Sequence, residues 1–146
     1  MPSPALHKAD FAALSEFRYQ MRRFERFSEN AALAEGITPL QYLLLLHIKG
    51  YPGRDWASVG ELAERLQAQQ HGVVALVTRC ETADLVQRKT STLDRRRVEV
   101  HLRPAGEALL ARLAAIHRAE LQSLTGVFVI PNLGPQPWPN WKPRRA

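Results

Sequence analysis

Residues 86–97 carry a concentrated positive charge, with five basic side chains and a single acidic one. Guanidinium and ammonium groups bind phosphate oxygens, so a run of them favours a polyanionic partner. A solvated loop with no partner is the alternative interpretation. The cations and the acid are Arg88, Lys89, Arg95, Arg96, Arg97 and Asp94. We expect Asp94 to hold Arg96 through a charge-assisted hydrogen bond, which would stiffen this stretch.

A second set of candidate binding residues lies at 69–81. Apolar side chains at Val73, Leu76, Val77 and Cys80 recur at helical spacing and should face a core. The side chains left facing outward are Gln69, Gln70, His71, Val74, Ala75, Thr78 and Arg79. Glutamine suits adenine and small apolar groups suit the thymine methyl group, so this face fits the major groove of DNA. Exposed polar residues near a helix start are the alternative.

The sequence offers no catalytic constellation. It has no Ser-His-Asp order, no glycine-rich phosphate loop and no paired carboxylates at a strand end, and its histidines lack metal-ligand spacing. We therefore expect no enzyme activity, no metal and no cofactor. Cys80 invites a redox hypothesis, but its place on an inward face favours a small core residue. His47, on an apolar stretch, is better explained as a core or pocket residue than as a zinc ligand.

The composition narrows the class of protein. The chain has 146 residues, 45% of them hydrophobic, which suits one ordinary domain with a real core. Its net charge of +6 and its pI near 10.1 point to nucleic acid or an anionic membrane surface. The longest apolar run, at 42–48, is too short to span a bilayer, and the N-terminus lacks an apolar signal core. We therefore expect a cytoplasmic protein without a membrane partner. The single cysteine, which excludes an internal disulfide, fits that compartment.

Periodicity and end signals predict the elements that would position these side chains. In chain order they are helices over 10–33, from Thr38, from Ser58 and through 73–80, strands over 85–90 and 96–102, and a helix over 104–124. The starts at Thr38 and Ser58 are capping boxes. The helix from Thr38 is apolar nearly all round and should be central and buried. Residues 50–56 read as a loop, and Asp84 should end the fourth helix.

This order indicates a mainly α fold with a small β-hairpin wing, that is, a winged helix-turn-helix DNA-binding lobe with further helices. In that motif the second helix of the pair enters the major groove and the hairpin reaches along the duplex. Arg95 would then enter the minor groove, while Arg88, Lys89 and Arg97 contact phosphates.

The stretch "ADLVQRKTSTLDRRRVEVHLRPAGEALL" resembles the wing of the MarR family of bacterial transcription regulators. Its matching pieces are Leu85, Val86, Arg88, Lys89, Asp94, Arg96, Val98, Val100, Leu102 and Gly106. The stretch "RRFERFSENAALAEGITPLQYLLLLHI" likewise resembles the family's first helix running into its second, and the resemblance covers roughly 10–124. The chain departs from the family pattern at Asp84, usually Gly, at Arg103, usually Thr, and at a proline-rich tail in place of a sixth helix.

The resemblance implies a single MarR-like domain over 1–146. In it, 10–35 and 104–130 would form dimerisation helices and 38–102 the winged helix-turn-helix lobe. It implies a homodimeric, ligand-responsive repressor that binds a palindromic operator in double-stranded DNA. It also implies a small aromatic or anionic effector between the first helices and the lobe. The residues that could line such a site are Arg18, Met21, Arg22, Tyr42 and His47, which helix packing explains equally well.

The runner-up is a winged-helix protein-interaction module without specific DNA binding. The stretch 69–81 has no Arg or Lys in its first two turns, so the commonest guanine contact is missing there. The basic run at 86–97 argues against this alternative. In the Pro- and Trp-rich tail, 131–146, we expect Trp138 or Trp141 to dock on its own or the partner subunit.

Overall fold

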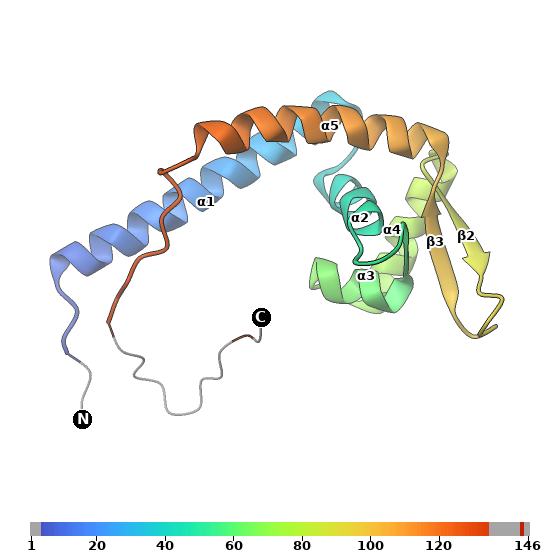
Figure 1. The fold of residues 1–146 in the computed structure, drawn as a ribbon, viewed down its shortest axis with the longest axis horizontal. Coiled ribbons are helices and arrows are strands. Elements are labelled where there is room, and N and C mark those ends of the chain that lie inside the picture. The colour runs from blue at the N-terminus through green and yellow to red at the C-terminus, as the bar shows by residue number, and fades with distance from the viewer. Residues whose placement is uncertain (1–3, 135–143, 145–146) are drawn as a thin grey trace. The chain divides into compact units, whose positions relative to one another are not determined.

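The computed structural model describes residues 4–134 and 144, coloured along the chain in Figure 1. The chain divides into two compact units: Arg26–Ser123, and Met1–Glu25 together with Leu124–Ala146. The first helix contributes to both. The elements in chain order are α1 (Lys8–Ala34), α2 (Pro39–Lys49), β1 (Trp56–Ser58), α3 (Val59–Leu66), α4 (Gln70–Thr82), β2 (Val86–Thr90), β3 (Val98–Leu102) and α5 (Pro104–Ser123).

Side-chain caps start α2 and α3. The Thr38 hydroxyl accepts a hydrogen bond from the Gln41 backbone N–H at 3.2 Å, and the Gln41 side chain accepts one from the Thr38 N–H at 2.8 Å. Ser58 and Glu61 form the same reciprocal pair at 3.2 and 2.9 Å. Each pair satisfies donors that a helix leaves without partners, and both capping-box predictions are confirmed.

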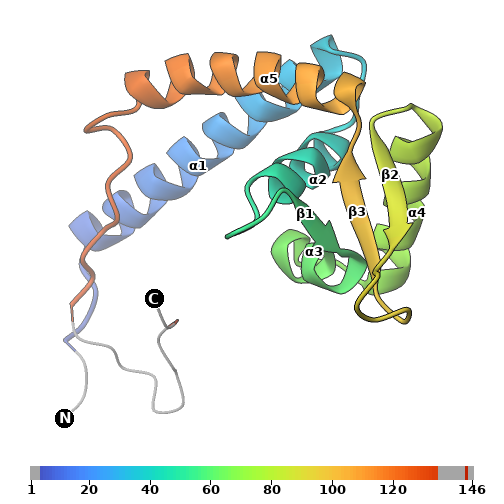
Figure 2. The ribbon, with the colours of Figure 1, turned by 45° about the vertical axis from the view of Figure 1, so that its right-hand side comes forward.

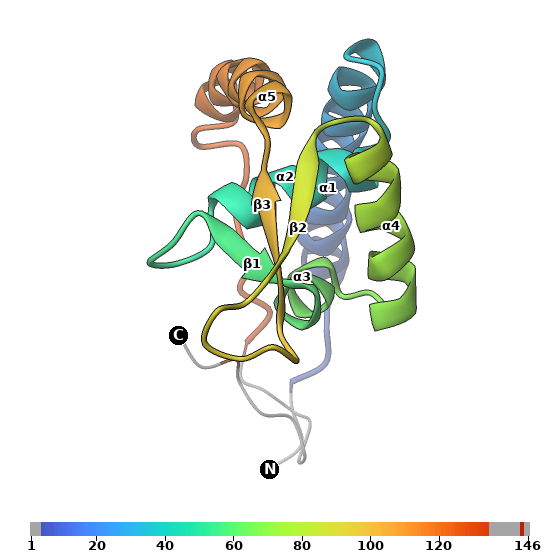
Figure 3. The same ribbon diagram turned by 90° about the vertical axis from the view of Figure 1, so that its right-hand side faces the viewer.

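The strands form a three-stranded antiparallel sheet in the order β1-β3-β2, with β3 in the middle as Figure 3 shows. The predicted hairpin is present, with Val86 opposite Leu102 and Thr90 opposite Val98. The prediction of a loop over 50–56 is wrong at Trp56, which begins β1 and pairs with His101. A strand of three residues is too short to reveal alternation, and its pairing depends on a partner far along the chain.

Helix α2 lies at the centre of the core of the unit Arg26–Ser123. Its Leu44, Leu45 and Ile48 are fully buried, as predicted. Figure 2 shows α2 beside α3 and the sheet, which supply the surrounding apolar side chains together with α4 and α5. The fully buried residues from those elements include Leu62, Val77, Cys80, Val86, Val100 and Leu113.

The chain turns between α4 and β2 at Asp84, the predicted end of the helix. Asp84 has a φ of 62°, the left-handed conformation that Gly adopts more readily. Gly106, in the first turns of α5, packs directly against this turn. A Cβ at Gly106 would lie 2.2 Å from the Leu85 carbonyl oxygen, so only glycine permits this approach.

In the other unit, the N-terminal part of α1 and the segment after α5 share an aromatic contact. The rings of Phe17 and Phe128 meet edge to face with centroids 5.4 Å apart. Helix α5 ends at Ser123, as predicted to within one residue, and the assignment of 10–35 and 104–130 to a dimer interface stays a prediction. Gly126, with a φ of 81°, makes the chain turn just after α5. Trp138 and Trp141 lie outside the described residues.

Within residues 4–134 and 144, none of the helices alone combines the length and apolar character needed to cross a membrane. The bent pair of α1 and α2 meets that test jointly, by length and composition only.

Candidate nucleic-acid interface

Helix α4 has one buried and one exposed face, as predicted. Val73, Leu76, Val77 and Cys80 are buried. The seven residues predicted to face outward are all exposed: Gln69, Gln70, His71, Val74, Ala75, Thr78 and Arg79. The outer face is therefore a continuous surface available to a ligand.

The buried face of α4 also settles the environment of Cys80. Burial raises the pKa of its thiol to about 11, so the sulfur stays protonated near neutral pH. A protonated, buried thiol is a poor nucleophile and a poor metal ligand, which supports the interpretation of Cys80 as a core residue. Within the described ranges, no three His, Cys, Asp or Glu side chains gather into a possible metal site.

The start of α4 leaves backbone donors without side-chain partners. Gln67, with a left-handed φ of 52°, ends α3, and Gln69 begins α4 with an extended backbone and no side-chain cap. The first N–H groups of a helix lack partners within it and carry the positive end of its dipole. This terminus therefore suits a phosphate oxygen, and Gln70 and His71 beside it are placed to reach into a groove.

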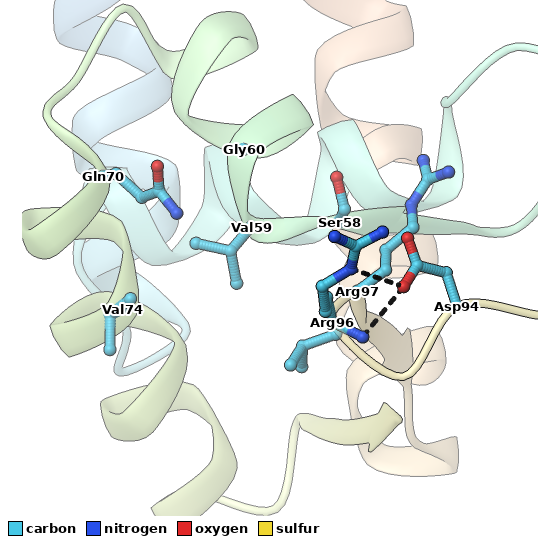
Figure 4. A pocket seen from close by; sticks show the side chains of 9 residues that line it. Ser58, Val59, Gly60, Gln70, Val74, Asp94, Arg96 and Arg97 are labelled. Carbon is cyan, nitrogen blue, oxygen red and sulfur yellow. Dashed lines mark hydrogen bonds and ion pairs between the residues drawn. The ribbon is translucent and has the colours of Figure 1, made fainter. Parts of the chain in front are cut away.

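A hollow of about 450 Å³ separates α4 from the wing, the hairpin of β2, β3 and their connecting loop (Figure 4). It is lined by Ser58, Val59, Gly60, Gln70, Val74, Asp94, Arg96, Arg97 and Val98. These residues come from the start of α3, the first turns of α4 and the wing. The hollow thus brings predicted residues of α4 and predicted residues of the wing onto one surface.

Asp94 organises the loop of the wing, as predicted. Its carboxylate accepts hydrogen bonds from the Arg96 backbone N–H at 3.0 Å and from Arg96 Nε at 3.4 Å. The side chain of Arg96 is nevertheless 94% exposed and keeps most of its donors for another partner. Arg95 and Lys89 are also exposed, and the described part of the chain gives neither side chain a bonded partner.

Arg88, by contrast, has three partners on α4. Its guanidinium donates to the Thr78 hydroxyl at 2.7 Å and to the Val74 carbonyl at 3.0 Å, and it pairs with Glu81 at 3.1 Å. These bonds tie β2 to α4 between Val74 and Glu81. The sequence predicted a phosphate contact for Arg88, which stays a prediction beside this internal role.

Arg97 belongs to a cluster that the sequence analysis did not identify. It donates to Glu61 Oε1 at 2.7 Å, and its guanidinium lies 5.3 Å from the centre of the Trp56 ring. Arg54 lies 3.8 Å from the same ring centre and also pairs with Glu61. The cluster joins the base of the wing to α3 and β1, and the phosphate contact predicted for Arg97 likewise stays a prediction. The short distance between Arg54 and Trp56 in the sequence was a signal that could have indicated this cluster.

Glu61 keeps its charge inside this cluster. Burial alone would raise the pKa of its carboxyl group. Hydrogen bonds from Tyr51, Ser58 and Arg97 outweigh that effect and hold the pKa well below its ordinary value. Glu61 therefore remains a carboxylate under all physiological conditions and a fixed anchor for the two arginines.

The residues predicted to bind an effector are divided between the two units. Arg18, Met21 and Arg22 line a hollow of about 60 Å³ with Glu25, which pairs with Arg22 at 3.7 Å. Sites for small molecules usually measure roughly 300–1,000 Å³, so this hollow is smaller than a usual ligand site. The effector site of these three residues stays a prediction.

Tyr42 and His47 belong to the unit Arg26–Ser123. Tyr42 is buried, its ring stacks on His117 with centroids 4.8 Å apart, and burial raises its pKa. Burial and then the charge of Arg65 lower the pKa of His47, so its imidazole is neutral at pH 7. Packing accounts for Tyr42 without an effector, and the ligand contact predicted for both residues is still only a prediction.

Comparison with known proteins places this architecture in a family. Residues 35–97 match the model of the MarR family. A Thauera aromatica protein, named for transcriptional regulation of the hcr operon, is 34% identical over 96 residues, which cover 66% of this chain and 56% of that protein. The transcriptional repressor MdtR of Bacillus subtilis is 32% identical over 95 residues, covering 62% and 59%. The chain therefore spans less than two thirds of the length of both relatives.

Among solved structures, AbsC, a MarR family transcriptional regulator from Streptomyces coelicolor, matches with a TM-score of 0.73 and 22% identity. The match covers 88% of this chain and 86% of that one. It confirms the predicted fold, mainly helical with a small antiparallel wing sheet. The segment that matches the family holds α2, the helix-turn-helix pair α3 and α4, and most of the wing. Residues 35–97 therefore carry the pattern of the MarR family, on a fold shared with a solved MarR regulator.

Proposed function

We propose that this chain is a sequence-specific DNA-binding transcription regulator and not an enzyme. One observation carries the proposal: Gln70 and Val74 of α4 line the same hollow as Arg96 and Arg97 of the wing. A helix face with amide and methyl groups suits base edges, and a basic ribbon beside it suits the phosphate backbone. The net charge of +6 fits the same partner.

In this proposal α4 enters the major groove and the wing follows the neighbouring backbone. The helix would use its seven exposed residues, with Gln70 and His71 deepest because they lie at its N-terminal end. Arg95 would enter the minor groove, where narrow segments attract guanidinium groups. Lys89 and Arg96, both exposed, would contact phosphates.

A second copy of the chain would cover apolar side chains on the N-terminal part of α1 and on the segment after α5. Those exposed there are Phe11, Leu14, Tyr19, Val127, Phe128, Val129 and Ile130. Their number in one small unit supports the homodimer that a palindromic operator requires. Light scattering should give twice the chain mass of 16.5 kDa, and a 16.5 kDa particle at micromolar concentration would contradict the dimer.

The proposed direction of regulation is repression, since the relative MdtR is named a repressor. An aromatic or anionic effector bound by Arg18 and Arg22 would release the DNA. Benzoate serves as a simple aromatic anion for the test. It should release the parent protein from DNA but not Arg22→Ala, and equal release of both would remove Arg22 from the site.

Selection of duplexes from a random library by the full chain tests the function itself. We expect a palindrome whose half-site centres lie about one helical turn, 10–10.5 base pairs, or a multiple of it apart. If no sequence is enriched, the winged-helix protein-interaction module becomes the better account, and the absence of Arg and Lys from the first two turns of α4 would explain why.

A further inference from the structure

The loop at the tip of the wing carries one large apolar side chain, Leu93. It is 98% exposed, more than any other large hydrophobic residue in the described part of the chain. Burying a leucine side chain contributes about 1.5–3 kcal/mol. Because Leu93 stays exposed, its side chain adds no such free energy to the stability of the fold and is available to a partner.

The backbone around Leu93 is held by hydrogen bonds. The buried Ser91 hydroxyl accepts hydrogen bonds from the N–H groups of Leu93 and Asp94, both at 3.2 Å. Ser91 N–H donates to the Arg97 carbonyl and Arg97 N–H to the Asp94 carbonyl, both at 2.9 Å. The bond from Arg96 N–H to the Asp94 carboxylate, at 3.0 Å, closes the same turn. A turn fixed in this way loses little backbone entropy when a partner binds Leu93.

The charges near Leu93 indicate the chemistry of that partner. Arg95 and Arg96 follow Leu93 in the same loop and are exposed. Lys89 is exposed on β2, the strand that leads into this loop. A fitting partner has a narrow groove wide enough for a leucine and anionic rims on both sides. The minor groove of DNA has this character, and proteins insert leucine and similar apolar side chains into it.

Resting on the function proposed above, we infer that Leu93 enters the minor groove beside the half-site contacted by α4 and makes the wing selective for A·T pairs there. The reason is steric. A guanine carries an N2 amino group on the floor of the minor groove, whereas A·T pairs leave that floor open. Arg95 supplies electrostatic attraction to the same groove, and Leu93 adds the preference for its shape.

The test uses the full chain and fluorescence anisotropy on a duplex selected by the parent protein from a random library. Three versions of this duplex differ only in the base pairs just outside each half-site: A·T, G·C, or inosine·C. Inosine·C presents the major-groove face of G·C but lacks the N2 amino group. We expect the A·T and inosine·C versions to bind about tenfold tighter than the G·C version, because an excluded leucine loses its apolar contact.

Leu93→Ala should bind the three versions with nearly equal affinity, and Leu93→Met should restore the discrimination because its apolar volume is similar. Thr92→Ala, at the neighbouring exposed position, is the matched control and should discriminate like the parent. Both Leu93 variants should fold, since the side chain is exposed and the bond to Ser91 uses the backbone.

Two results overturn the inference. If Leu93→Ala keeps the parent's discrimination while Arg95→Ala weakens binding to all three versions, Leu93 does not read the groove and the proposed function stands. If the parent protein selects no duplex at all, the proposed function fails and the inference fails with it. An acidic protein groove would then be the better partner for this loop.

Discussion

Arg103 Nε lies 2.7 Å from a carboxylate oxygen of Asp84 in an ion pair, which joins the two side chains at which the sequence departs from the MarR pattern. Asp84 occupies the left-handed turn after α4, and Arg103 directly precedes α5. The backbone of Arg103 strengthens the link by donating to the Leu85 carbonyl at 2.9 Å. The ion pair therefore offsets part of the conformational cost of an aspartate where glycine fits best.

Substitutions at Asp84 should separate the backbone effect from the ion pair. Asp84→Ala should lower the free energy of unfolding by about 1–2 kcal/mol, because alanine disfavours a positive φ and loses the carboxylate. Asp84→Gly should change it by less than about 1 kcal/mol, since relief of the backbone offsets the lost exposed pair. Urea denaturation followed by circular dichroism measures both. Equal losses in the two variants would show that the pair, not the conformation, dominates.

Gly106→Ala should destabilise the fold by roughly 1–3 kcal/mol, because its Cβ would press on the Leu85 carbonyl and force α5 away from the turn. Gly72→Ala in α4 is the matched control. No atom lies within 4 Å of a Cβ there, so alanine should be neutral or stabilise by up to about 1 kcal/mol. Thermal unfolding compares the two. If Gly106→Ala leaves the melting temperature unchanged, the packing of α5 against Leu85 adjusts at little cost in free energy.

Glu61→Gln should destabilise the fold at pH 7 by about 1–3 kcal/mol, because Arg54 and Arg97 lose their carboxylate. The pKa of Glu61 is lowered in the folded state. Its contribution to stability is therefore fully present above the ordinary pKa of 4.5 and is lost as the pH falls through the folded pKa. Urea midpoints between pH 7 and pH 3 should fall more steeply for the parent than for Glu61→Gln. Glu64→Gln is the control. If the urea midpoints of the parent and of Glu61→Gln fall in parallel, Glu61 does not anchor the two arginines.

Arg88 and Lys89 are adjacent on β2 but should behave differently. Arg88→Ala should lower the free energy of unfolding by roughly 1–2 kcal/mol, because it loses the bonds to Thr78, Val74 and Glu81. Lys89→Ala should leave stability unchanged and reduce the salt dependence of DNA binding by about one unit in log K against log salt. Urea denaturation and anisotropy at several salt concentrations check the pair. Equal stability of the two variants would remove the structural role of Arg88.

Local signals in the sequence predicted the features that depend on near neighbours. The caps at Thr38 and Ser58, the inward face of α4 and the bond from Asp94 to Arg96 all join residues within a few positions. Strand β1 was missed because it exists only through pairing with β3. The pairing of Arg97 with Glu61 depends on the same contact, since nothing near either residue in the sequence indicates the other.

Sequence-specific DNA binding is tested most directly by anisotropy on the selected duplex and on a scrambled duplex of the same composition, at one salt concentration. The account predicts binding to the selected duplex at least about a thousandfold tighter. It also predicts that Arg95→Ala weakens that binding by roughly 1–3 kcal/mol without loss of the fold. Equal affinity of the parent protein for both duplexes, unchanged in Arg95→Ala, would contradict the account.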